Sequence, residues 1–171
     1  MINKDMLLNE LNNKNIQHTL HIHDALYTVD DSIQKRGSIP GTHTKNLFLK
    51  NKKNNFFLIT CEENDERNLK KISKSLNLGN VSFAKEEYLL KYLGVKPGSV
   101  SPFALLNDKN NIVNFFMEKK IYDSQLINFH PLLNDATITI EKTKFIEFMI
   151  EKKIKIHIFS CLEGVVFKTY E

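Results

Sequence analysis

Strand-like and helix-like apolar patterns interleave along the whole sequence. Leu7, Leu8 and Leu11 recur at helical spacing near the N-terminus, and apolar residues then alternate with polar ones over residues 16–22. Side chains alternate between two faces along a strand but repeat about every 3.6 residues along a helix, so the two periods distinguish the elements. The chain therefore begins with a helix that leads into a strand.

Apolar runs on either side of polar loops predict two hairpins. In the first, over residues 47–60, "LFL" and "FFLIT" flank the loop "KNKKNN". In the second, over residues 95–117, "VKPGSVSPFALLND" is expected to run from a loop into a strand, and "NIVNFFM" to return after the turn-like "NDKNN".

The remaining patterns add helices and strands in mixed order. Helices are expected over residues 65–76, 85–94 and 141–153, and strands within 81–84, 128–140 and 154–159. Strict alternation of strand, helix and strand is absent. The pattern predicts an α+β fold with one domain over residues 1–171, built on a curved mixed or antiparallel sheet with flanking helices.

Composition restricts the class of protein only loosely. Twenty-four Lys plus Arg, 22 of them lysine, stand against 20 Asp plus Glu, a net charge of +4 that permits a nucleic-acid partner without requiring one. Cys61 and Cys161 form no C-x-x-C spacing, which favours a reducing compartment. No apolar run approaches the roughly 20 residues of a membrane span. We expect a soluble, cytoplasmic protein.

Familiar catalytic and metal-binding motifs are absent from the sequence. His18, His21 and His23 lie close together, but no H-x-x-x-H or Cys/His pair completes a zinc set. The sequence also lacks G-x-S-x-G, a Walker A loop and G-x-G-x-x-G. We expect neither a metal nor a cofactor.

Three short stretches could still carry chemistry. In "PGSVSP", residues 97–102, glycine and proline shape a loop whose backbone N–H groups could meet an oxyanion, although an ordinary turn has the same signature. In "HPLLN", Pro131 holds His130 extended, and Asn134 follows in a turn. By spacing alone, Lys45 is either a solvated lysine at the start of a strand or a point charge for a phosphate.

Taken in order, "GTHTKNLFLK", "LGVKPGSVSPFALLND" and "FHPLLNDATITI" resemble the YbaK/ProX prolyl-tRNA-editing superfamily, and within it the free-standing alanyl-tRNA(Pro) deacylases. The resemblance implies a hydrolase that acts in trans on the ester between a wrong amino acid and the 3′ end of tRNA(Pro). Its partners would be that tRNA and, transiently, prolyl-tRNA synthetase. A monomer without cofactor is implied.

The resemblance also assigns residues. Lys45 matches a lysine that engages the 3′-terminal nucleotide, Gly98 opens a G-x-x-x-P loop whose amides face the aminoacyl carbonyl, and His130 matches the histidine of an "HPL" element. These three are the expected catalytic residues. Substrate contacts are implied for Tyr27, Thr28, Asn46, Ser99, Val100, Ser101, Pro102 and Asn134.

The chain departs from the family pattern at a few positions. Asp24 and Ala25 replace prolines after His23, whose role stays open, while Asn68 and Glu118 stand where aspartates are common. Cysteinyl-tRNA(Pro) deacylation and a non-catalytic binding module remain alternatives to alanyl-tRNA(Pro) deacylation. An activated ester with a vicinal ribose hydroxyl needs positioned water and a polarised carbonyl rather than a dedicated nucleophile. A small pocket would exclude proline by size.

Overall fold

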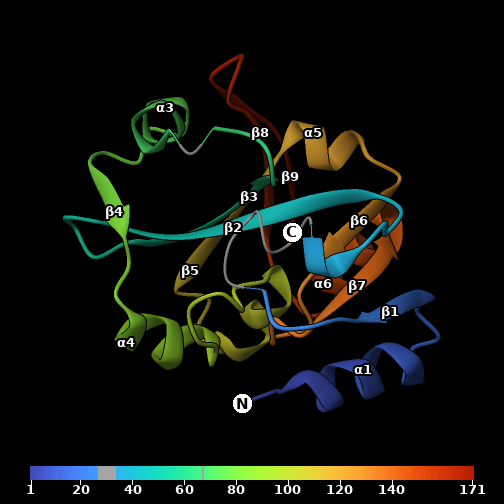
Figure 1. Ribbon diagram of the computed structural model, residues 1–171. Helices are drawn as coiled ribbons and strands as arrows, with labels where there is room; N and C mark the ends of the chain where they lie inside the picture. The colour runs from blue at the N-terminus through green and yellow to red at the C-terminus, as the bar shows by residue number, and fades with distance from the viewer. Residues whose placement is uncertain (27–33, 67) are drawn as a thin grey trace.

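A mixed β-sheet runs through the centre of the molecule (Figure 1). The computed structural model describes residues 1–26, 34–66 and 68–171. Within these residues nine strands pair in the order β1-β7-β6-β2-β3-β5-β8-β9, with β4 beside β2. The strands are β1 (His18–Ile22), β2 (Thr42–Asn51), β3 (Phe56–Glu62), β4 (Val81–Phe83), β5 (Val113–Glu118), β6 (Leu126–Phe129), β7 (Ala136–Glu141), β8 (Ile156–Ser160) and β9 (Val165–Tyr170).

Short helices flank this sheet. They are α1 (Lys4–Asn13), α3 (Leu69–Ser75), α4 (Glu86–Tyr88), the π-helical η1 (Leu89–Leu93), the 3-10 helix η2 (Pro102–Asn107), α5 (Lys119–Asp123) and α6 (Lys142–Glu151). The expected fold class, a mixed sheet with flanking helices, is confirmed. In the described part of the chain no helix has both the length and the apolar character to cross a membrane.

The first predicted hairpin forms and the second does not. Strands β2 and β3 pair antiparallel, with Leu47 opposite Ile59. In the second region the prediction of a strand is wrong, because the chain folds into η2: Ser101 caps its first turn and Pro102 occupies a helix-start position. Strand β5 therefore pairs in parallel with β3 and β8 instead of folding back on a neighbour.

Two departures from the family pattern coincide with helix starts. The Asn68 side chain accepts a hydrogen bond from the Lys71 N–H, so α3 begins later than residue 65. Glu118 caps α5 by accepting from the Lys120 N–H. Each side chain satisfies an amide that the first helical turn leaves without a partner, so both positions are explained by local structure.

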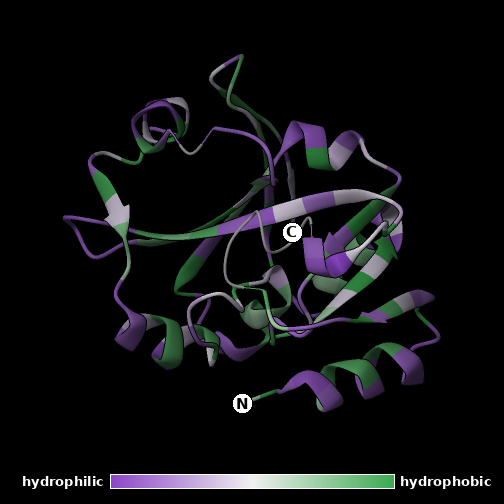
Figure 2. Cartoon of the chain, viewed as in Figure 1, coloured by the Kyte–Doolittle hydropathy of each residue, from purple (hydrophilic) through white to green (hydrophobic). Residues whose placement is uncertain are grey.

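Hydrophobic cores lie on both faces of the sheet. The larger one joins the sheet to α1, η1, η2 and α6 through side chains that include Leu7, Leu93, Phe103 and Phe148. The smaller one joins it to α3 through Ile72. Figure 1 shows α3 on one side of β2, with α1 and α4 on the other. Figure 2 shows green and purple segments mixed along α1, as expected for a helix with one buried face.

Asn107 joins three segments of the chain inside the larger core. Its amide donates to the carbonyls of Leu93 and Ile2, and its carbonyl accepts from the Ile2 N–H at 2.6 Å. Gly94 ends η1 with φ of 64°, and a Cβ on it would lie 2.9 Å from the Asn107 amide nitrogen. A residue with a Cβ at position 94 would therefore be strained in its backbone angle and would crowd the side chain of Asn107.

We expect Gly94→Ala to destabilise the protein more than Gly79→Ala. Both glycines have positive φ, which costs a Cβ-bearing residue about 1 kcal/mol, but nothing lies within 4 Å of a Cβ on Gly79. At Gly94 the displaced Asn107 bonds add about 1–3 kcal/mol. Urea unfolding followed by circular dichroism measures both variants, and equal losses would mean that the Asn107 bonds contribute nothing.

Candidate functional site

Lys45 is buried in the sheet, 9% exposed, as the fourth residue of β2. It faces Cys61 across the β2–β3 ladder. No acceptor or carboxylate among the described residues pairs with its ammonium group. The interpretation of Lys45 as a solvated lysine is therefore wrong. A buried charge without a partner is unfavourable, so its position calls for an anionic ligand.

Cys61 is not a nucleophile in this setting. Burial raises the pKa of its thiol to about 12, although the charge of Lys45 acts in the opposite direction. The reactive form of cysteine is the thiolate, which is negligible at neutral pH with such a pKa. Covalent catalysis through the cysteine opposite Lys45 is therefore excluded.

An ion pair occupies the next position on the same face of the β2–β3 pair. Arg36 donates from Nη1 and Nη2 to the two carboxylate oxygens of Glu63 at 3.0 and 3.1 Å, and both side chains are 10% exposed. The Glu63 N–H donates to the His43 carbonyl, two residues from Lys45. Residues two apart on one strand share a face, so Lys45, His43 and Glu63 lie on the same side of the sheet.

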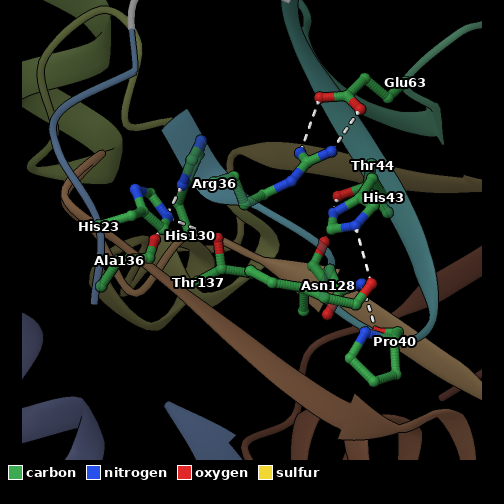
Figure 3. Close-up of polar contacts among 11 residues, drawn as sticks. His23, Arg36, Pro40, His43, Thr44, Glu63, Asn128, His130, Ala136 and Thr137 are labelled. Carbon is green, nitrogen blue, oxygen red and sulfur yellow. Dashed lines mark hydrogen bonds and ion pairs between the residues drawn. The ribbon is translucent and has the colours of Figure 1, made fainter. Parts of the chain in front are cut away.

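His130 is held as a neutral imidazole beside this pair (Figure 3). Burial lowers its pKa, and the charge of Arg36 acts in the same direction. Its Nδ1 lies 3.2 Å from the Ala136 carbonyl, which can only accept, so Nδ1 carries the proton. The Nε2 lone pair of His130 is left as a hydrogen-bond acceptor.

His23 supports the site through its contacts. Its Nδ1 donates to the Asp24 carbonyl at 2.8 Å, so its Nε2 accepts from the Thr137 hydroxyl at 2.9 Å. Its backbone N–H donates to the Asp135 carbonyl. Both ring nitrogens are thus occupied, and His23 connects β7 to the turn that holds Asn134.

The loop after η1 presents backbone amides that lack an acceptor in the described part of the chain. The Ser99 N–H donates to the Lys96 carbonyl and closes a turn in which Gly98 has φ of 86°. The N–H groups of Gly98, Val100 and Ser101 have no acceptor among the described residues. Donors grouped in one short loop can stabilise an oxyanion.

The loop lies against the turn after His130. An added Cβ on Gly98 would be 3.6 Å from the Asn134 side-chain nitrogen, which donates to the Leu26 carbonyl. In the same loop Ser99, Ser101 and Pro102 are buried and Val100 is half-buried. The structure therefore brings together the predicted residues of the loop and Asn134, with His130 four residues before Asn134.

Asn46 is separated from Lys45 although the two are neighbours in sequence. Alternation along β2 points Asn46 to the opposite face, where its side-chain carbonyl accepts from the Thr60 hydroxyl at 2.5 Å. Tyr27 and Thr28 lie outside the described residues. The contacts expected of these three residues with substrate stay predictions.

Sequence reasoning missed Arg36, Glu63, His43 and Thr137. Their spacing in the sequence forms no motif. They come together only through the pairing of the strands and the ion pair of Arg36 with Glu63. One signal was available: Arg36 is one of only two arginines among 24 basic residues, and arginine suits a buried bidentate pair better than lysine does. Among the described residues no group of three or more His, Cys, Asp or Glu could hold a metal ion.

Known proteins that are similar to this chain identify its family. Residues 23–148 match the model of the aminoacyl-tRNA editing domain. Prolyl-tRNA synthetase associated domain-containing protein 1 of Xenopus laevis is 32% identical over 84% of this chain and 88% of its own length. The prolyl-tRNA editing protein ProX of Acetoanaerobium sticklandii is 30% identical over 80% of this chain and 84% of its own length.

Solved structures share the fold. One that is described as a candidate trans-editing enzyme for prolyl tRNA synthetase superposes with a TM-score of 0.64, at 13% identity, over 94% of this chain and 98% of its own. The family model covers most of the chain, and the ProX relative matches it over most of both lengths. The chain belongs to the aminoacyl-tRNA editing domain family, as a domain of the prolyl-tRNA-editing type.

Proposed function

We propose that this chain hydrolyses the aminoacyl ester of mischarged tRNA(Pro), with alanyl-tRNA(Pro) as its main substrate. The observation that carries the proposal is the burial of Lys45, without a partner among the described residues, on the face that also holds His43 and Glu63. A phosphate of the 3′-terminal nucleotide would neutralise that charge. The relatives named for prolyl-tRNA editing support the same substrate class.

Each part of the site has a place in this reaction. The amides of Gly98, Val100 and Ser101 donate to the ester carbonyl and to the oxyanion that forms when water attacks its carbon. The neutral Nε2 of His130 accepts a hydrogen bond from the vicinal ribose hydroxyl, which orients the water. The ester C–O bond then breaks as a proton from the attacking water passes to the leaving ribose oxygen, which releases the free amino acid and a tRNA with an intact 3′ hydroxyl.

A deacylation panel tests the reaction and its specificity together. Purified protein is incubated with alanyl-, cysteinyl- and seryl-tRNA(Pro), and the remaining ester is measured over time. We expect the fastest loss with alanine, because a pocket that excludes proline by size admits the smallest side chain. Faster loss of cysteine would reassign the substrate, and binding without hydrolysis would identify a non-catalytic module.

Lys45→Met should separate function from stability. Methionine keeps most of the side-chain volume and removes a buried charge that has no partner among the described residues, so we expect the free energy of unfolding to stay the same or rise. Deacylation of alanyl-tRNA(Pro) should fall at least tenfold. The matched control is Lys53→Met at the exposed β2–β3 loop, expected within twofold of wild type. Wild-type activity in Lys45→Met contradicts the phosphate role.

Gly98→Ala should reduce turnover through the shape of the loop. A Cβ fits the space, but a φ of 86° strains alanine and rotates the neighbouring amides. Gly164→Ala is the control, because that glycine has φ of 69° and nothing within 4 Å of its Cβ. Both variants should lose about 1 kcal/mol of stability, but only Gly98→Ala should lose tenfold or more in kcat. Equal kcat in the two variants would remove the loop from the mechanism.

The free energy of unfolding should decrease as the pH is lowered, because the imidazole of His130 resists protonation in the folded protein. The pKa of His130 is lowered by burial, so below about pH 6.5 the unfolded chain binds a proton that the folded chain binds less readily. His130→Asn keeps a donor for the Ala136 carbonyl without titrating. Its free energy of unfolding should fall less between pH 7 and pH 5 than that of wild type; an identical pH profile would show that His130 is not the cause.

A further inference from the structure

We infer that a surface formed by α5, β9 and the start of α6 binds RNA outside the editing site. It consists of three aromatic rings and three lysines, and we name it the aromatic–lysine surface. Its residues are Lys119, Tyr122, Lys142, Phe167, Lys168 and Tyr170. The inference rests on the proposed function only in its choice of tRNA as the RNA.

An irregularity in the β8–β9 pairing builds this surface. Ile158 pairs with Lys168 and Phe159 with Val166, so Phe167 is an extra residue on β9. A bulge of this kind turns neighbouring side chains to one side of the strand. The ring of Phe167 consequently lies 6.1 Å from that of Tyr122 on α5, between centroids.

Tyr170 completes the aromatic part. Its ring centroid is 6.3 Å from that of Tyr122, and the two hydroxyls are 2.8 Å apart. Phe167 is 42% exposed, although an apolar ring of this size is usually buried. The accessible ring of Phe167, held beside the ring of Tyr122, can accept a planar group without losing much conformational entropy.

Lysine ammonium groups stand over these rings. Lys168 lies 4.4 Å from the Tyr170 ring centroid and Lys142 4.4 Å from that of Tyr122, while Lys119 is 5.8 Å from Phe167. Such contacts hold the charges near the rings but are weak at exposed positions, so a stronger anion can draw the lysines away. The rings are then free to stack.

RNA fits this combination better than an acidic protein does. Lysines meet phosphates, and unstacked bases pack on aromatic side chains, which an acidic peptide does not require. The carboxylates that act on Lys119 are Asp123, which pairs with it, and Glu163 and Glu118, whose charges lie near it. Lys142 and Lys168 have no carboxylate partner among the described residues, so the surface keeps positive charge.

The position of α5 connects this surface to the candidate site. Lys120 of α5 pairs with Asp65, just after β3, and the Ser124 hydroxyl bonds to that of Thr42 at the start of β2. Both contacts lie at the end of the sheet where Lys45 faces Cys61. A tRNA whose 3′ end occupies the candidate site would have its preceding nucleotides or its acceptor stem within reach of α5 and β9.

Binding of uncharged tRNA tests the inference. The full chain is titrated into fluorescein-labelled, uncharged tRNA(Pro) transcript, and fluorescence anisotropy is followed at several salt concentrations. The test variant is Lys142→Ser with Lys168→Ser, and the matched control is Lys52→Ser with Lys53→Ser, which removes the same charge from the β2–β3 loop. We expect at least a tenfold weaker Kd in the test variant and less than a threefold change in the control. The slope of log Kd against log salt should fall by about 1.4–1.8 in the test variant.

Phe167→Leu tests the stacking part without changing charge. Leucine keeps an apolar side chain but offers no ring face, so we expect at least fivefold weaker binding with an unchanged salt slope. Uncharged tRNA contains no ester, so these measurements stand whether or not the chain proves to be a deacylase.

Three results would overturn the inference. The first is wild-type affinity in both the double-lysine and Phe167→Leu variants, and the second is equal weakening in the test and control doubles. The third is a stable dimer of wild type in sedimentation that Phe167→Leu dissociates, because a second copy would then be the partner of β9.

Discussion

Strand β2 holds the two halves of the sheet together, and its register sets which side of the sheet Lys45 and His43 face. It pairs in parallel with β6 at Thr42 and His43 and antiparallel with β3 from Thr44 to Lys50. A shift of one residue would exchange its two faces. Lys45 would then point into the larger core, and Asn46 would take its place opposite Cys61.

The same register places Lys45 at the border between an apolar core and a group of polar side chains. Apolar side chains such as Leu47 and Ile59 fill the face beyond Lys45, so Lys45 stands where the small core ends. Around it Arg36 and Glu63 form an ion pair, while burial lowers the pKa of His130 and raises that of the Cys61 thiol. The described residues of this site include no strong nucleophile. The site suits a substrate that is already activated, as an aminoacyl ester is.

Much of the fold could be predicted from hydrophobic periodicity. Strands β2, β3 and β4 and helix α6 follow from local patterns, because their alternation or helical spacing extends over enough residues. Strand β9 could not, since "VVFKTY" is an exposed edge without alternation and its pairing with β8 contains a bulge. The apolar run of the 3-10 helix that begins at Pro102 is compatible with a strand as well, and packing of Phe103 against Phe129 and Phe145 favours the helix.

The residues of the candidate site likewise fall into two groups, those that the sequence predicts and those that only the structure shows. Lys45, Gly98 and His130 could be predicted from motif resemblance, whereas Arg36, Glu63 and Thr137 are recognised only once the strands are paired. Sequence adjacency also misled in one case, because it grouped Asn46 with Lys45 while the pleat of β2 separates them. Motif resemblance therefore points to the loop and the histidine, and the pairing of the strands shows the groups around them.

The central claim is that the amides of the 98–102 loop receive the carbonyl of an aminoacylated 3′-terminal adenosine. The most direct measurement is an amide NMR titration of ¹⁵N-labelled protein with 3′-alanylamino-3′-deoxyadenosine, a non-hydrolysable amide analogue. We predict saturable shifts for the amides of Gly98, Val100 and Ser101, with Gly164 unchanged. Saturable binding that leaves the three loop amides unshifted would contradict the account.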